Sequence, residues 1–111
     1  MEIAVTSYPQ CTVVKAAGRI DSYTTPHLAE TLDQLQRKGQ YKIVLDMAGV
    51  DFISSSGLRV LITTLKSCRK VDQGDLILAC VPERILSALD LAGFTNFFKL
   101  FENVPVAVNQ F

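Results

Sequence analysis

The sequence has no excess of charge of either sign, because 11 basic side chains balance 11 acidic ones over 111 residues. Without a basic run, it lacks the electrostatic signature of a protein that binds nucleic acid or an anionic membrane. Apolar runs are also short, since charged residues interrupt each one before the ~18 residues of a membrane span. The segment Met1–Val5 carries an acid where a signal peptide would be basic. We therefore expect a cytoplasmic protein with no membrane span and no direct contact with nucleic acid.

Cysteine and histidine are too few and too scattered for a metal site. The three cysteines, Cys11, Cys68 and Cys80, form no Cys-x-x-Cys pair, and His27 is the only histidine. Free cysteine packs like a small hydrophobic residue, so we expect reduced core thiols, and we expect His27 to be a partly exposed helix residue and not a ligand.

Two catalytic motifs are missing. No Gly-x-Ser-x-Gly elbow is present, and His27 would have to serve as the base of any serine hydrolase. A phosphate-binding Gly-x-x-x-x-Gly-Lys-(Ser/Thr) loop is absent too. The sequence thus predicts a protein that is not an enzyme and has no cofactor.

What is present is the composition of a compact domain, with 49% apolar and 20% charged residues. No repeat or linker divides the chain, so we expect one domain over residues 1–111. Short β-branched stretches at 2–6 and 12–17 predict two paired strands. A helix should follow, capped by Thr25, with Pro26 at its first position and Gly39 at its end.

The second half alternates strand and helix. We expect a buried strand at 41–47, a helix from Leu58, a strand at 76–80, and a helix that Pro82 opens and Gly93 closes, with Ala92 able to face the core. The aromatic stretch 94–101 suits a last strand. Asn103 can cap a short helix at the end of the chain, although the valines there are poor helix formers. The predicted class is α/β, with a mixed sheet of four or five strands in the order β-β-α-β-α-β-α-β and a final helix left open.

Three serines, Ser54, Ser55 and Ser56, stand where the central strand gives way to a helix. One explanation is capping alone, in which a serine accepts a backbone N–H bond for ~1 kcal/mol. The other is phosphorylation, since the free N–H groups and dipole of a helix start stabilise a phosphate. A phosphate would add about −1.5 to −2 charge. The acids expected around it are Asp21, Asp46 and Asp51.

Several ordered motifs of the chain resemble one family. They are Gly18-Arg-Ile-Asp21, Val44-Leu-Asp46, Val50-Asp-Phe52-Ile, Ser55-Ser56-Gly57-Leu58 and Leu91-Ala-Gly93-Phe94. Together they resemble the STAS domain, in particular the bacterial anti-sigma factor antagonists. The resemblance implies a single STAS-like domain whose unphosphorylated form binds an anti-sigma factor serine/threonine kinase and so releases a sigma factor. Phosphorylation breaks that complex, and a serine phosphatase restores it.

By the same resemblance the phosphorylated residue is Ser55, with Ser54 and Ser56 as alternatives. The implied partner-binding residues are Asp21, Ser54, Ser56, Gly57 and Arg59. Asp21 has an alternative role as a turn residue that satisfies local N–H groups.

Two positions depart from the family pattern. Ser54 replaces the usual Asp, and Arg59 stands where a small residue is common. Arg59 is either a solvated helix charge or a partner for a phosphate one helical turn away. Within the same fold, the alternative function is a partner-switch or scaffold module that controls a phosphatase, a cyclase or another signalling protein.

Overall fold

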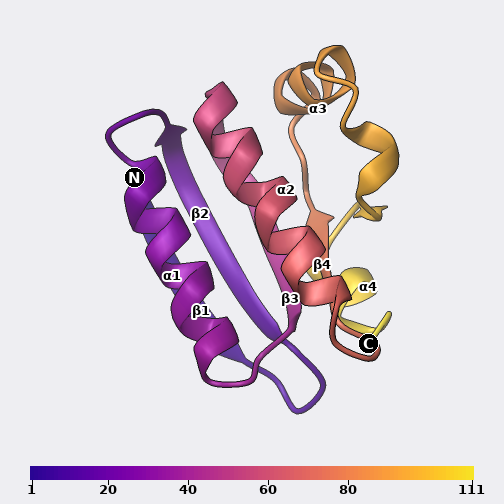
Figure 1. Cartoon of the computed structure of the whole chain (residues 1–111). Coiled ribbons are helices and arrows are strands. Elements are labelled where there is room, and N and C mark those ends of the chain that lie inside the picture. The colour runs from indigo at the N-terminus through magenta and orange to yellow at the C-terminus, as the bar shows by residue number, and fades with distance from the viewer.

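The computed structural model describes all 111 residues and contains one five-stranded mixed sheet flanked by helices (Figure 1). The strands are β1 (Glu2–Ser7), β2 (Thr12–Ile20), β3 (Lys42–Ile53), β4 (Asp75–Ala79) and β5 (Leu100–Phe101). They lie side by side in chain order. Only β1 runs antiparallel to its neighbour, and the other pairs are parallel. The α/β class, the mixed sheet and the order of elements are therefore confirmed.

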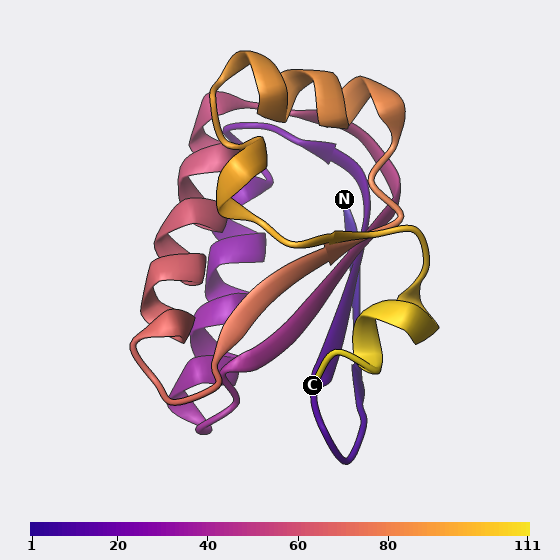
Figure 2. The same ribbon diagram turned by 90° about the vertical axis from the view of Figure 1, so that its right-hand side faces the viewer.

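Helices lie on both faces of the sheet (Figure 2). One face is covered by α1 (Thr25–Arg37) and α2 (Ser55–Arg69), while α3 (Glu83–Leu91) lies across the end of the sheet. The opposite face is partly covered by α4 (Val104–Val108). None of these helices has both the length and the apolar character that crossing a bilayer requires.

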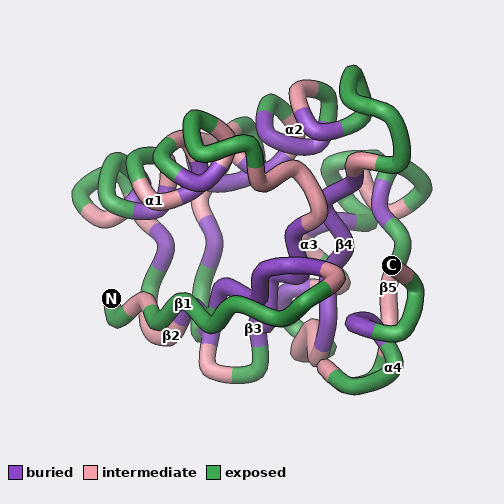
Figure 3. The backbone as a smooth tube through the Cα atoms, turned by 90° about the horizontal axis from the view of Figure 1, so that it is seen from below, coloured by how far each residue is buried: buried purple, intermediate pink, exposed green.

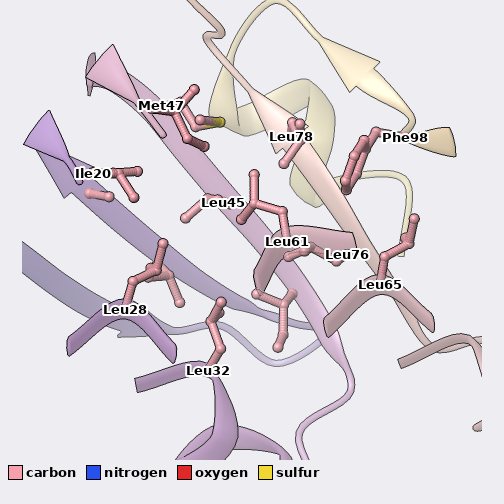
Figure 4. Packing of buried hydrophobic residues seen from close by; sticks show 14 of the residues in the cluster. Ile20, Leu28, Leu32, Leu45, Met47, Leu61, Leu65, Leu76, Leu78 and Phe98 are labelled. Atoms are coloured by element: carbon pink, nitrogen blue, oxygen red, sulfur yellow. The ribbon is translucent and has the colours of Figure 1, made fainter. Parts of the chain in front are cut away.

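The main core lies between the sheet and the first three helices (Figure 4). The leucine stripe of α1 is buried there: its members recur three or four residues apart in the sequence, on one helical face, and are Leu28, Leu32 and Leu35. A smaller cluster on the other face joins Val13, Val44 and Ile77 to Ala107 and Val108 of α4. Because β3 is apolar on both of its faces, it is covered on both sides as its sequence predicts.

The sequence did not decide whether a helix forms at the end of the chain, and the structure contains it as α4. The side chain of Asn103 caps α4 by accepting a hydrogen bond from Val106 N at 2.9 Å. Gly39 and Gly93 have φ angles of 82° and 76°, which explains why glycine ends the helices before them. His27 is exposed, all three cysteines are free, and Cys11 and Cys68 are buried.

Several predictions about boundaries and burial were wrong. Thr25 is the first residue of α1 instead of its cap, and the cap position belongs to Thr24. Strand β3 extends to Ile53, because β2 continues beside it to Ile20. Ala92 is exposed. The stretch 94–101 is mostly not a strand: Thr95–Phe97 forms a 3-10 turn, and only Leu100 and Phe101 pair with β4.

The aromatic side chains explain this last difference. Phe98 inserts into the main core, and the rings of Phe94 and Phe97 meet edge to face at 6.1 Å. Packing of large rings, instead of a strand ladder, thus fixes most of the segment. A short apolar run does not distinguish these outcomes.

Candidate functional site

The candidate site is the junction between β3 and α2, at the end of the sheet where β2 also finishes. The backbone N–H of Ser54 donates to the carbonyl oxygen of Ile20 at 2.8 Å. This bond holds the start of α2 against the end of β2. The turn that follows β2, which includes Asp21, therefore lies next to the serines. The sequence predicted this proximity of Asp21.

Ser54 is the residue that caps α2. Its Oγ accepts a hydrogen bond from Gly57 N at 3.2 Å, and its carbonyl accepts from Leu58 N at 3.0 Å. Since a helix start leaves its first N–H groups without partners, this cap stabilises the first turn. The capping explanation thus applies to Ser54.

Ser56 points inward from the same turn. Its Oγ lies 2.8 Å from Ser54 Oγ and 3.5 Å from Thr25 Oγ1, and the residue is half-buried. The three hydroxyls form a short network that ties the start of α2 to the start of α1. Ser56 is therefore engaged with neighbouring hydroxyls.

Ser55 differs from both neighbours. The residue is exposed, and its hydroxyl takes part in no hydrogen bond of the structure. It opens a 15-residue helix whose first N–H groups, apart from that of Gly57, have no side-chain cap. A phosphate on Ser55 would be favoured by these N–H groups and by the positive end of the helix dipole.

Gly57 lies beneath this turn and is buried. A Cβ at this position would meet Ile20 Cγ2 at 2.7 Å and Ile53 Cγ1 at 2.9 Å, closer than real Cβ contacts come. The absence of a side chain lets α2 approach both strands. The structure therefore gives Gly57 a packing role and little exposed surface.

Asp21 organises the turn between β2 and α1. Its Oδ1 accepts hydrogen bonds from Tyr23 N at 3.0 Å and from Thr24 N at 3.1 Å. These bonds, the one from Thr24 first, lower the pKa of the Asp21 carboxyl below its ordinary value, and Arg19 adds to the effect. The turn role that the sequence offered as an alternative is thus observed.

Arg59 is exposed one turn along α2 and forms no ion pair within 4.0 Å. It borders an open groove between α1 and α2, on whose other side lie Glu30 and Asp33. The side chain is therefore free to turn toward α1 or toward the helix start.

One predicted member of the acidic surroundings lies elsewhere. Asp46 is buried in the middle of β3 on the face that carries α4, where its carboxylate accepts a bond from Ala48 N at 3.1 Å. The expectation that Asp46 contributes charge at the serines was wrong, because the alternation of β3 turns it to the opposite face from Leu45. Asp51 is exposed.

Sequence reasoning missed two exposed aromatic side chains in the segments next to the serines. Tyr23 is 91% exposed in the turn after β2, and Phe52 is 38% exposed near the end of β3. The Arg19 guanidinium stacks on the Phe52 ring at 4.3 Å, and its Nε lies 3.8 Å from Asp21 Oδ2. The sequence signal that could have found Phe52 is the alternation of side chains along a strand, which turns Ile53 toward the core and Phe52 toward solvent. Exposed aromatic side chains of this kind are common at protein interfaces.

Comparison with known proteins adds the family. The model of the STAS domain matches residues 2–107. The chain belongs to the STAS domain family. An anti-sigma-B factor antagonist of Staphylococcus epidermidis is 32% identical over 93 residues, covering 84% of this chain and 85% of the relative.

Solved structures share the fold. A STAS domain protein of Planctomyces limnophilus, an anti-sigma-factor antagonist, superposes with a TM-score of 0.86 at 22% identity, over 97% of this chain and 95% of the other. The anti-sigma factor antagonist SpoIIAA in its unphosphorylated form gives 0.83 at 12% identity, over 98% and 95%. The Bacillus cell fate determinant SpoIIAA in its phosphorylated form gives 0.76 at 13% identity, over 98% of both chains. The STAS fold is thus found in a protein that exists with and without phosphate.

Proposed function

We propose that this STAS domain is an anti-sigma factor antagonist controlled by phosphorylation of Ser55. Its unphosphorylated form binds an anti-sigma factor serine/threonine kinase, which then releases its sigma factor. Phosphate on Ser55 breaks the complex, and a serine phosphatase reverses the modification. The domain works by binding and catalyses no reaction itself.

The observation that carries this proposal is the difference among the three serines. Ser54 Oγ caps the helix and Ser56 Oγ bonds to it, whereas the Ser55 hydroxyl is exposed and unbonded. A kinase can reach Ser55 without breaking a bond of the fold. The staphylococcal relative, named as an anti-sigma-B factor antagonist, supports the same function.

The surroundings of Ser55 supply the partner surface in this proposal. Tyr23 and Phe52 offer exposed aromatic area, and Asp21 fixes the backbone of Tyr23 by accepting its N–H. Phosphate would place about two negative charges beside this surface. Such charge opposes docking by like-charge repulsion against acids of the partner and by the cost of burying it. A coupling of ~1 to 3 kcal/mol is enough to change occupancy ~5 to 150-fold.

The test uses the purified chain, its cognate kinase and ATP. We expect the intact mass to rise by one phosphate in the wild type and in Ser54→Ala and Ser56→Ala, and to stay unchanged in Ser55→Ala. Labelling of Ser55→Ala at the wild-type rate would overturn the assignment. As a second measure, Ser55→Glu should bind the kinase at least ~10-fold more weakly, with a thermal midpoint no lower than that of the wild type.

A second function within the family uses the same surface. The domain would then bind a kinase that controls a phosphatase, a cyclase or another signalling protein. The exposed Ser55 suits any partner whose binding depends on phosphorylation of this residue. The two functions therefore differ only in which protein the kinase releases. Capture of the kinase complex and identification of the released protein distinguishes them.

A further inference from the structure

The outer edge of β1 is unpaired along its whole length. The strand is the first in the sheet order and pairs on one side only, with β2. At the opposite edge β5 has two residues, and α4 follows directly. Residues of β1 are exposed apart from the half-buried Ile3, as the largely green strand in Figure 3 shows. The sheet therefore has one long free edge.

The β1–β2 hairpin determines which backbone groups face outward. Tyr8 N donates to Cys11 O at 2.8 Å, across a two-residue loop. Antiparallel ladders alternate between bonded and unbonded pairs. Counting back from Tyr8 in the observed register, Thr6, Ala4 and Glu2 direct their N–H and C=O groups to β2. Ile3 and Val5 thus direct theirs away from the sheet, where they have no partner.

This edge lacks the features that usually prevent strand pairing. Natural edge strands carry lysine, proline, bulges or inward charges for that purpose. In β1 the only charged residue is Glu2, at its first position, and no residue is proline. Val5 lies opposite the fully buried Val14 on the face that carries α1, yet it is 46% exposed. An apolar side chain at the rim of the core is left half-covered.

We propose that β1 pairs with β1 of a second copy of this chain, so that two sheets join into one across a two-fold axis. The axis passes through Ala4, which lies opposite its own copy. Directly opposite residues of an antiparallel pair share a face. Ile3 therefore lies opposite Val5 of the other copy, on the face that carries α1, and Glu2 lies opposite Thr6 on the other face.

This register suits the side chains. Both Ile3–Val5 contacts extend the apolar core and cover the exposed part of Val5. The two Glu2 carboxylates lie at opposite ends of the joined strands, so no like charges face each other. The outward N–H and C=O groups of Ile3 and Val5 gain partners in the same pairs. The strand is self-complementary, which is what a two-fold interface requires.

The flank of α1 above this edge does not oppose the pairing. His27 lies near the first residues of β1, and Thr31, Gln34 and Lys38 follow it on the same helical face. Lys38 at the end of the helix is charged, and the two-fold axis places the two copies of it at opposite ends of the interface. This register pairs five strand residues on each side, Glu2 to Thr6, which is fewer than the 20 to 30 residues of a standard interface. The dimer is therefore weak and forms with rising concentration.

The serine site stays outside this interface, because α1 separates α2 from the β1 edge (Figure 1). Pairing of β1 and phosphorylation of Ser55 are thus independent, and an experiment that refutes one proposal leaves the other unaffected.

The first test is disulfide trapping with oxidised glutathione. Ala4→Cys places two thiols at a non-bonded pair, where Cα atoms are ~4.5 Å apart, within the range of a disulfide. Thr6→Cys is the matched control, because its two copies lie about 13 Å apart in this register. We expect a covalent dimer from Ala4→Cys, at least ~10-fold more than from Thr6→Cys or the wild type. Equal trapping in both variants, or none in Ala4→Cys, would overturn the register.

The second test is sedimentation equilibrium up to about 1 mM protein. The wild type should shift from monomer to dimer as concentration rises. Val5→Lys, a change at a half-exposed position, should raise the dissociation constant at least ~10-fold while the monomer still unfolds in one cooperative transition at low concentration. Thr6→Lys faces Glu2 of the other copy and should associate as well as the wild type or better. A wild type that stays monomeric throughout overturns the proposal and leaves the edge to a strand of another protein.

Discussion

The hydroxyl oxygens of Ser54 and Ser56 lie 2.8 Å apart and share a hydrogen bond, and the Ser55 side chain between them points to solvent without a partner. In a helix successive side chains are rotated by about 100°, so three adjacent serines cannot occupy the same environment. The start of α2 thus divides three identical side chains into a cap, an inward-facing hydroxyl and a free one.

The first prediction concerns the cap. Ser54→Ala removes the acceptor for Gly57 N and should lower the free energy of unfolding by ~1 kcal/mol, within a range of ~0.5 to 2. Urea denaturation measures this loss. Ser55→Ala is the matched control, since its hydroxyl makes no bond, and it should stay within ~0.5 kcal/mol of the wild type. Equal losses in both variants would contradict the assignment of the cap.

The second prediction concerns the close packing of Gly57. Gly57→Ala introduces a Cβ into the space of Ile20 and Ile53 and should cost about 1 to 3 kcal/mol by overpacking, despite the better helix propensity of alanine. Denaturant unfolding is again the measurement. Thr63→Ala, an exposed position on the same helix, is the control and should be neutral within ~0.5 kcal/mol. If Gly57→Ala were more stable than the wild type, α2 would be able to move away from Ile20 and Ile53 without loss of stability, which contradicts the prediction.

Much of this site was accessible from sequence. The three serines at a helix start, the role of Asp21 in a turn and the leucine stripe of α1 each follow from local patterns, because capping, turns and amphipathic faces depend on residues close in the chain. The different environments of Ser54 and Ser56 do not, since the Thr25 hydroxyl that Ser56 approaches comes from another helix. Nor did the sequence show on which face of the sheet Asp46 lies, because that depends on where β3 ends and on which of its alternating side chains face α4.

The last strand shows the same limit. The segment 94–101 has the composition of a strand, but β4 offers a partner for two residues only, and Phe98 leaves the edge to enter the core. Strand pairing is a property of two segments, so one segment's composition does not determine its length.

The third prediction is a pH dependence that Asp21 contributes. Because its pKa is lowered in the folded state, the unfolded chain binds more protons as pH falls through the acidic range. The stabilisation from Asp21 is therefore fully present above the ordinary pKa of an aspartate and is lost as pH falls toward the lowered one. Asp21→Asn keeps an acceptor oxygen but has no titratable proton.

The thermal midpoint measured from pH 5 to about pH 2.5 tests this, since that range spans the titration of aspartate. We expect the difference between wild type and Asp21→Asn to be largest at the upper end and to shrink with falling pH. Asp90→Asn, an exposed position in α3, is the control and should show a smaller change of that difference with pH. A constant difference for Asp21→Asn would mean that its carboxylate adds no charge-dependent stability.

The fourth prediction concerns Arg59 and rests on the proposed modification of Ser55. A residue four positions along a helix lies on the same face, and the Arg59 guanidinium has no ion pair that holds it elsewhere. It should therefore turn toward a phosphate on Ser55 and donate charge-assisted hydrogen bonds to it. Arg59→Ala should lower the stability of the phosphorylated protein by about 0.3 to 1 kcal/mol and leave the unphosphorylated protein within that margin of the wild type.

Thermal unfolding of both forms of each variant measures the coupling between the two groups as a double-mutant cycle. Lys66→Ala is the matched control, because Lys66 is an exposed cation on the same helix but lies 11 residues, about 16 Å, beyond Ser55. It should change the two forms equally. An Arg59→Ala variant that does the same would make Arg59 a solvated helix charge, and Arg19, which already lies beside Asp21 and Phe52, would be the next cation to replace.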